Sequence, residues 1–210
     1  MITKENIDTG KKIYDQLSGW KKRREAIISL FGQNTRNNST KVVLPKIATI
    51  DKYYSTSIYN PDELAEYIVS IKHLDEMLKE GNPEAVEQIR QFKLNGKLKN
   101  ILSFASKYCH FHKTDSYPIY DQYAALALQK LSDWRDFPES QSQKRTFAYF
   151  REGVVSLKNK NGLANISFED FDSFLWLFGQ LESLNSGKSK INKEVSALYK
   201  KDSELFYKLR

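Results

Sequence analysis

The sequence contains little cysteine, and this excludes several kinds of protein. The 210 residues include one cysteine, Cys109, so no disulfide can form within the chain and a reducing compartment is expected. A cysteine-ligated iron–sulfur cluster is excluded for the same reason. No stretch approaches the roughly 18 apolar residues of a membrane span, and the N-terminal residues MITKENIDTGKK lack the apolar core of a signal peptide. We therefore expect a cytoplasmic protein that does not enter a membrane.

Metal ligands are also scarce. Cys109, His110 and His112 are close in sequence, but a mononuclear site needs three or four convergent ligands. The two histidines would point to different faces of a helix. We therefore expect neither a metal nor a cofactor.

Acidic residues are outnumbered by basic ones. The chain has 33 Lys and Arg against 26 Asp and Glu, which gives a formal net charge of +7 and a pI of about 9.2. This balance favours a phosphate-bearing partner such as nucleic acid, although many basic proteins bind none. Hydrophobic residues make up 40% of the chain, which is enough to build a folded core.

The apolar residues recur mainly at helical spacing. The pattern predicts helices over about 8–30, 61–81, 84–95, 98–111, 121–131, 140–158, 167–184 and 191–209. Asn60-Pro61 and Asn82-Pro83 are start signals, and Gly81 and Asn95-Gly96 are end signals. The only run typical of a strand is Val42-Val43-Leu44, which is short. The chain is expected to be all-α.

The segment 97–128 combines a basic helix start, a turn and an acid. Lys97 and Lys99 are expected at the start of one helix, where backbone amides and lysines together suit phosphate. Asp121 is expected to open the next helix, and a capping role alone would explain an acid there. Tyr117, Tyr120 and Tyr123 surround it; core packing would explain each, and aromatics of this kind also stack against an extruded base.

The residues LSFASKYCHFHKTDSYPIYDQY (102–123) resemble the segment around the catalytic aspartate of the helix-hairpin-helix DNA glycosylase superfamily, in its 8-oxoguanine glycosylase branch. Ala105-Ser106 match an Ala-Ser step of that segment, Pro118-Ile119-Tyr120 match the approach, and Asp121 matches the acid. The resemblance implies one two-lobed helical domain over residues 1–210, with lobe junctions near residues 32–45 and 132–140. It also implies base excision from double-stranded DNA by a monomeric hydrolase, in DNA repair or in defence against phages with modified DNA.

Two departures from the family shape the expected mechanism. Ser103 stands where bifunctional members have their nucleophilic lysine, and Lys99 and Ile101 stand where the hairpin glycines would be. The resemblance therefore implies a monofunctional enzyme with an altered hairpin. In it, Asp121 stabilises the oxocarbenium-like sugar and positions the attacking water. Lys107 is a spare amine on the same helix.

The resemblance also assigns binding residues. The expected substrate contacts, with Trp176 as a further candidate, are Ser103, His110, Tyr120 and Tyr123. The expected nucleic-acid contacts are Lys97, Lys99, Ser106 and Lys107. Two other functions stay open. One is a non-catalytic nucleic-acid-binding module on a degenerate glycosylase fold, and the other is an interaction or phage-defence protein without a nucleic-acid role.

Overall fold

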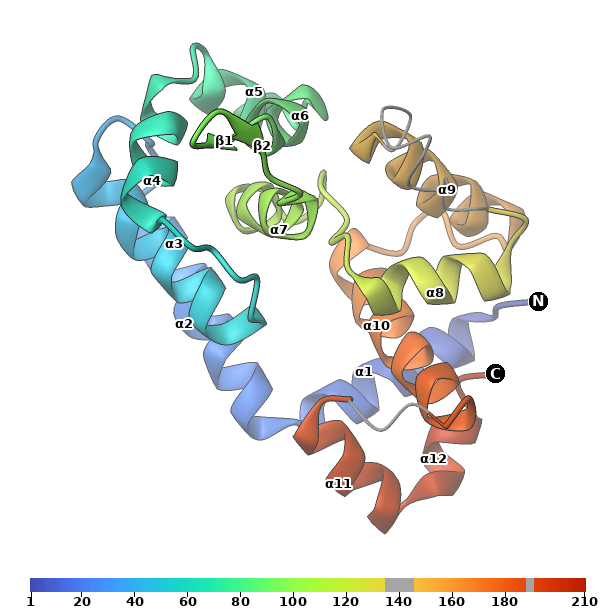
Figure 1. The fold of residues 1–210 in the computed structure, drawn as a ribbon. Coiled ribbons are helices and arrows are strands. Elements are labelled where there is room, and N and C mark those ends of the chain that lie inside the picture. Colours follow the sequence, from blue (N-terminus) through green and yellow to red (C-terminus); the bar gives the residue numbers. More distant parts are fainter. Residues whose placement is uncertain (135–145, 188–190) are drawn as a thin grey trace. The chain divides into compact units, whose positions relative to one another are not determined.

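A computed structural model describes residues 1–134, 146–187 and 191–210, and within them the chain is mostly helical (Figure 1). The elements are α1 (Lys4–Gln16), α2 (Ser18–Gln33), α3 (Thr40–Tyr54), α4 (Pro61–Ser70), α5 (Leu74–Glu80), α6 (Glu84–Arg90), β1 (Lys93–Leu94), β2 (Lys97–Leu98), α7 (Leu102–His112), α8 (Gln122–Leu131), α9 (Phe147–Lys160), α10 (Phe168–Asn185), α11 (Lys193–Lys201) and α12 (Ser203–Tyr207). Among the described residues, no helix has the length and apolar character needed to cross a membrane.

The chain divides into two compact units. The terminal unit comprises Met1–Lys22 and Asp121–Arg210, and the central unit comprises Arg23–Tyr120. The division therefore falls after Lys22 and after Tyr120. Residues 32–45, where a junction was expected, lie inside the central unit, and residues 135–140 of the other expected junction lie outside the described residues.

Helix α10 is the centre of the terminal unit, where it packs against α8 and is crossed by α1 (Figure 1). Ser167 caps its start by accepting a hydrogen bond from the amide of Asp170. Its buried residues include Phe171, Phe174 and Leu175. The residues that follow α12 are tied to this body because the side chain of Asn6 donates hydrogen bonds to the carbonyls of Lys208 and Arg210.

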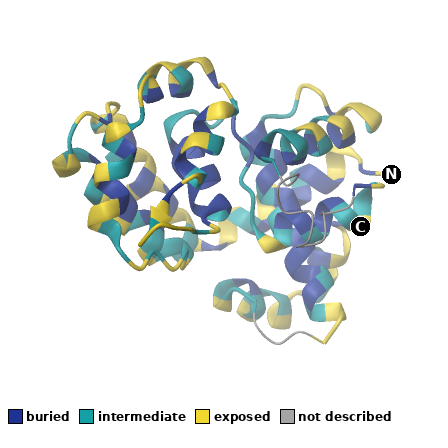
Figure 2. Cartoon of the chain, turned by 45° about the horizontal axis from the view of Figure 1, so that its top comes forward, coloured by how far each residue is buried: buried dark blue, intermediate teal, exposed yellow. Residues whose placement is uncertain are grey.

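Helix α7 has the corresponding place in the central unit. Every residue from Leu102 to Phe111 is buried except Ser103, and α3 and α6 pack against it. A helix that is buried on all sides is the middle of a bundle. Figure 2 shows the pattern of burial within each unit. Buried residues lie on the inner faces of the helices, and exposed residues lie on the outer faces and loops.

Several predictions for the N-terminal half were wrong. The first helix begins at Lys4, where Thr3 and Asn6 form a capping box, and not near residue 8. It also breaks at Leu17, so the predicted helix is two helices, α1 and α2. Residues 42–44 form no strand; they belong to α3, because Val43 shares a buried helical face with residues 47 and 50.

The start signal at residues 60–61 was confirmed, and α6 begins at Glu84, with Pro83 as its N-cap in place of the first helical residue. The side chain of Asn60 accepts a hydrogen bond from the amide of Glu63, and α4 begins with Pro61. Gly81 ends α5 in the left-handed conformation, with φ of 77°. The predicted helix over 61–81 is nevertheless interrupted after Ser70.

Asn95-Gly96 does not close a helix. Both residues have positive φ, 52° and 74°, and they form the two-residue turn of a β-hairpin in which Lys93 pairs with Leu98 and Leu94 pairs with Lys97. The Asn-Gly pair favours this turn because both positions require positive φ. α7 begins only at Leu102, so Lys97 lies in β2 and Lys99 in the connection that follows; neither lies at a helix start.

In the C-terminal part, α10 confirms the helix predicted over 167–184. The helix predicted over 140–158 is described from Phe147 onward, and its first residues lie outside the described residues. The helix predicted over 191–209 is two helices, because Asp202 ends α11 and caps α12 by accepting a hydrogen bond from the amide of Leu205.

Candidate catalytic residues of α7 and α8

Asp121 is the N-cap of α8, in the terminal unit. Its Oδ1 accepts hydrogen bonds from the backbone amides of Tyr123 and Ala124, both at 2.9 Å. Its Oδ2 accepts no hydrogen bond within the part of the chain that the structure describes, and the residue is partly exposed. One carboxylate oxygen is thus held by the amides of the helix start, while the other has no hydrogen-bond donor among the described residues.

Gly179 allows α10 to approach this helix start closely. A Cβ atom at residue 179 would lie 2.1 Å from the carbonyl oxygen of Tyr123. Tyr123 itself is half-buried, and burial together with the nearby charge of Asp121 raises the pKa of its phenol. The expected pair Asp121 and Tyr123 therefore shares the first turn of α8.

Lys107, in the central unit, is almost fully buried, with 2% of its surface exposed. Its ammonium donates to Ser103 Oγ at 2.8 Å, to the carbonyl of Ser103 at 3.2 Å and to the carbonyl of Tyr120 at 3.3 Å. It also lies 5.3 Å from the ring centroid of Tyr54. Side chains of a helix point toward its N-terminus, so the amine of Lys107 reaches back one turn to the position of Ser103.

Ser106 holds the segment that leads to α8. Its hydroxyl accepts a hydrogen bond from the amide of Tyr120 at 3.0 Å, and the side chain is fully buried. Ser103, Ser106, Lys107 and Tyr120, which the resemblance assigned to substrate and nucleic-acid contacts, are therefore brought together. Ser106 does so as an internal brace with no surface exposed to nucleic acid.

His110 is fully buried and both of its ring nitrogens have partners. The guanidinium of Arg24 donates to Nε2 at 3.2 Å, so Nδ1–H is the donor to the carbonyl of Tyr117 at 2.8 Å. Burial, reinforced by the charge of Arg24, lowers the pKa of His110 to about 3. The neutral ring fixes the turn between α7 and Tyr117 and has no nitrogen left for a base.

A buried polar cluster around Lys46 was missed from the sequence. The ammonium donates to the carbonyl of Arg36 at 3.0 Å, to Asn37 Oδ1 at 2.9 Å and to His112 Nε2 at 3.3 Å. Burial lowers the pKa of Lys46 to about 8 despite the attraction of Asp75. The sequence offered one signal of this cluster: Lys46 lies on the same helical face as the apolar residues 43, 47 and 50.

The remaining predicted contacts lie elsewhere. Lys97 is exposed and Lys99 is half-buried, both at the β1–β2 hairpin. Trp176 is half-buried on α10, where it stacks on Trp20.

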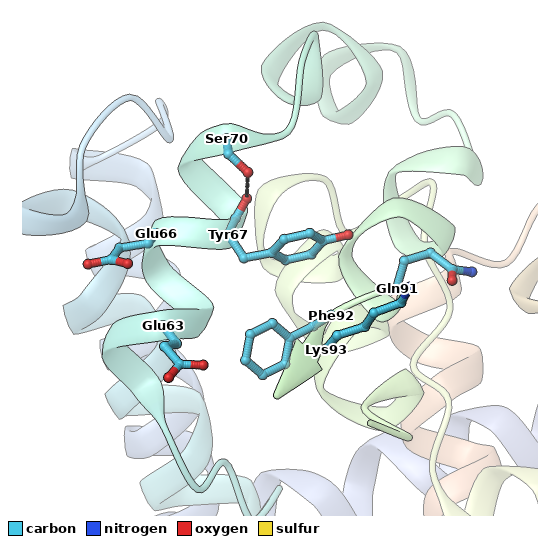
Figure 3. Close-up of a pocket in the computed structure, with 7 residues that line it drawn as sticks. All are labelled: Glu63, Glu66, Tyr67, Ser70, Gln91, Phe92 and Lys93. Atoms are coloured by element: carbon cyan, nitrogen blue, oxygen red, sulfur yellow. Dashed lines mark hydrogen bonds between the residues drawn. The ribbon is translucent and has the colours of Figure 1, made fainter. Parts of the chain in front are cut away.

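The central unit also has a surface hollow with a volume of about 640 Å³ (Figure 3). It is lined by Glu63, Glu66, Tyr67, Ser70, Gln91, Phe92 and Lys93. The ring of Tyr67 lies 5.7 Å from that of Phe92, and its hydroxyl donates to the carbonyl of Gln88. The lining includes none of the residues that the sequence predicted for a site.

Comparison with known proteins identifies a family. A family model named HI_0787_N, described as an N-terminal domain, matches residues 4–116. The chain belongs to the HI_0787_N family. An uncharacterized protein of Haemophilus influenzae (strain ATCC 51907 / DSM 11121 / KW20 / Rd) is 29% identical over 178 residues, which are 83% of this chain and 84% of that protein. No solved structure matches the chain significantly.

The HI_0787_N match includes α7, with Ser103, Ser106, Lys107 and His110. It ends before Asp121, the residue that begins the second part of the terminal unit. The family name and the relative assign no chemistry, so the function is inferred from the residues themselves.

Proposed function

We propose that this chain is a monofunctional DNA glycosylase that hydrolyses the bond between a damaged or modified base and its deoxyribose in double-stranded DNA. The observation that carries the proposal is the carboxylate of Asp121. Two backbone amides orient it through Oδ1, and Oδ2 is left available. It directly follows the segment, from Ala105 to Tyr120, that resembles the approach to the catalytic acid of helix-hairpin-helix glycosylases.

The proposed reaction uses water as the nucleophile. As the glycosidic bond lengthens, its electron pair moves to the base and positive charge develops on the sugar, where the Asp121 carboxylate stabilises it. Water then attacks C1′, its proton passes to Oδ2, and the departing base takes a proton from solvent. Ser103 cannot form a covalent imine, which is why we propose hydrolysis without a covalent intermediate.

The charge distribution supports a DNA partner. No acidic residue occurs between Glu87 and Asp115. That segment carries six basic residues, of which Lys107 is buried; the others are Arg90, Lys93, Lys97, Lys99 and Lys113. Lys93 and Lys97 are exposed on the two strands of the hairpin. Exposed lysines on either side of a turn can contact phosphates through their side chains where the glycine-rich hairpin is absent.

A second function is favoured by the internal bonding of the same residues. The Asp121 side chain accepts hydrogen bonds from two amides of the first turn of α8. Ser106 and His110 are buried and have hydrogen-bond partners inside the chain. These contacts suit a nucleic-acid-binding module in which Asp121 only caps α8. Such a module would bind DNA in a salt-dependent way, release no base, and keep its affinity in Asp121→Asn.

The test compares two capping aspartates. Asp121→Asn keeps a capping oxygen but removes the charge, and Asp202→Asn makes the same change at the cap of α12. Each protein is incubated with duplexes that carry 8-oxoguanine, uracil, alkylated purines or glucosylated hydroxymethylcytosine. Abasic sites are revealed with hot alkali, and a parallel sample is treated with borohydride.

Base release by the wild type and Asp202→Asn, absent in Asp121→Asn and without a trapped adduct, is the result that we expect. A borohydride-trapped adduct would contradict the monofunctional mechanism and direct attention to the amine of Lys107. Intact DNA binding without release from any duplex would favour the binding module. Failure to bind DNA at about 50 mM salt would contradict both the glycosylase and the binding module.

A further inference from the structure

The surface hollow of the central unit combines carboxylates with two aromatic rings (Figure 3). Its volume is about 640 Å³, and its lining includes Glu63, Glu66 and Tyr67 of α4 together with Phe92 and Lys93. The two rings have centroids 5.7 Å apart, and their planes differ by 47°. Phe92 is 5% exposed and Tyr67 is half-buried, whereas the charged residues are exposed. The hollow therefore has an apolar part that is sheltered and a charged part that faces solvent.

The aromatic part is held by contacts with α6. The hydroxyl of Tyr67 donates a hydrogen bond to the carbonyl of Gln88 at 2.6 Å, which ties α4 to α6. The amide of Phe92 donates to the carbonyl of Ile89 at 3.3 Å. These contacts order the two residues before any ligand arrives, which lowers the entropic cost of binding.

Negative charge is concentrated where α4 lines the hollow. Residues 61–87 contain eight acidic residues and two lysines, although the whole chain has a net charge of +7. Asp62, Glu63 and Glu66 are all exposed on α4, and none of them forms an ion pair within the described residues. Among the lining residues, Lys93 alone carries a positive charge. Carboxylates that lack partners, next to aromatic rings, favour a basic ligand.

The backbone of Lys93 can pair with an extended chain. The amide of Lys99 donates to the carbonyl of Phe92 at 3.0 Å, and hydrogen-bonded and non-hydrogen-bonded residue pairs alternate along an antiparallel ladder. Lys93 and Leu98 are therefore a non-hydrogen-bonded pair, and the amide and carbonyl of Lys93 point away from β2. Neither group has a hydrogen-bond partner in the part of the chain that the structure describes. An unpaired strand edge is where an extended segment of another protein can add.

We propose that the hollow binds an extended, basic segment of a partner protein. An arginine or lysine side chain of that segment packs against the ring of Tyr67 and pairs with Glu63 and Glu66. The backbone of the segment pairs with the amide and carbonyl of Lys93, which is why the occupant is a peptide and not a small cation. The inference does not rest on the proposed function, because it uses no step of the reaction assigned to Asp121.

The test uses a peptide of defined charge. The probe alternates threonine and arginine over about six residues, the usual length of a strand. It is blocked at both ends and labelled for fluorescence anisotropy, and a peptide with glutamate in place of arginine is the control. Both are titrated into the full chain at low salt, where charges are least screened. Circular dichroism confirms that each variant of the chain is folded.

The basic peptide binds, the acidic one does not, and the variants change the affinity with opposite signs. Glu63→Gln and Glu66→Gln each weaken binding roughly 2- to 5-fold, the range of exposed ion pairs. Lys93→Gln removes the opposing charge and strengthens binding by a similar factor. Glu80→Gln is the matched control and leaves the affinity unchanged, because Glu80 is exposed on α5 outside the hollow.

Four results would overturn the proposal. The first is no binding of the basic peptide up to roughly 1 mM, the limit of weak affinity. The second is equal weakening in Glu80→Gln and Glu63→Gln, which would reveal only general attraction between charges. The third is weaker binding in Lys93→Gln, which would indicate an anionic occupant. The fourth is a dimer in sedimentation equilibrium that Glu63→Gln dissociates while no peptide binds, which would assign the hollow to a second copy of this chain.

Discussion

The crossing of α8 and α10 makes Gly179 a position where one methyl group should be costly. A Cβ atom there would lie 2.1 Å from the carbonyl oxygen of Tyr123, 2.6 Å from its carbonyl carbon and 2.8 Å from its Cα. Cβ atoms in real structures essentially never approach another atom within 3.0 Å. All three neighbours are backbone atoms, so no side chain can rotate away and the helices must separate.

Overpacking of this kind typically costs about 1–3 kcal/mol, and we expect Gly179→Ala near 3 kcal/mol because backbone must move. For a chain of this size that corresponds to a fall in Tm of roughly 6–12 °C. Urea unfolding followed by circular dichroism measures the change directly. Under the proposed function, base release should also decrease, because Asp121 caps the displaced helix.

Gly32→Ala is the matched control. Gly32 lies in α2 and a Cβ atom there would have no neighbour within 4 Å. Alanine should therefore raise the free energy of unfolding by about 0.5–1 kcal/mol. The reasoning about the α8–α10 contact would be refuted if Gly179→Ala were as stable as the wild type, or if both substitutions had the same sign.

Three further predictions concern stability. Asp121→Ala removes the cap of α8 and should cost about 1 kcal/mol, whereas Asp121→Asn should stay within a few tenths; thermal unfolding that shows equal losses would contradict this. Burial lowers the pKa of His110 and of His112 to about 3. Between pH 7 and pH 5 the unfolded chain therefore takes up protons that the folded chain does not, and stability should fall by about 2 kcal/mol for His110 and by less for the partly exposed His112. Urea unfolding at both pH values measures this change, and a flat profile would show that these rings are accessible to protons. Gly96→Ala should cost about 1 kcal/mol through its positive φ alone, since a Cβ there meets no atom within 4 Å; calorimetry that shows no loss would count against the hairpin turn.

Local signals predicted the helix boundaries that depend on local contacts. Asn60, Ser167 and Asp121 cap helices through amides within three residues of themselves, so their neighbours in sequence were sufficient. Asn95-Gly96 was misread because the same pair suits both a helix end and a hairpin turn. Only the pairing of Lys93 with Leu98 decides between them.

The parts of the site that depend on distant residues could not be predicted. His110 is neutral because packing removes water from it and because Arg24, far earlier in the chain, binds its ring. The ammonium of Lys107 also donates to the carbonyl of Tyr120, which a loop outside α7 brings to it. Trp20 and Trp176 meet through the packing of helices that are distant in sequence.

The central claim is that the charge of Asp121 acts on the sugar during base release. Once a substrate duplex is known, single-turnover base release should be measured for the wild type, Asp121→Asn and Asp202→Asn, each checked for equal DNA affinity and folding. We expect a loss of roughly 10²–10³-fold in Asp121→Asn, as for other single electrostatic contacts to a transition state, and no change in Asp202→Asn. Equal rates in all three proteins would contradict the claim and leave Asp121 as the cap of α8 alone.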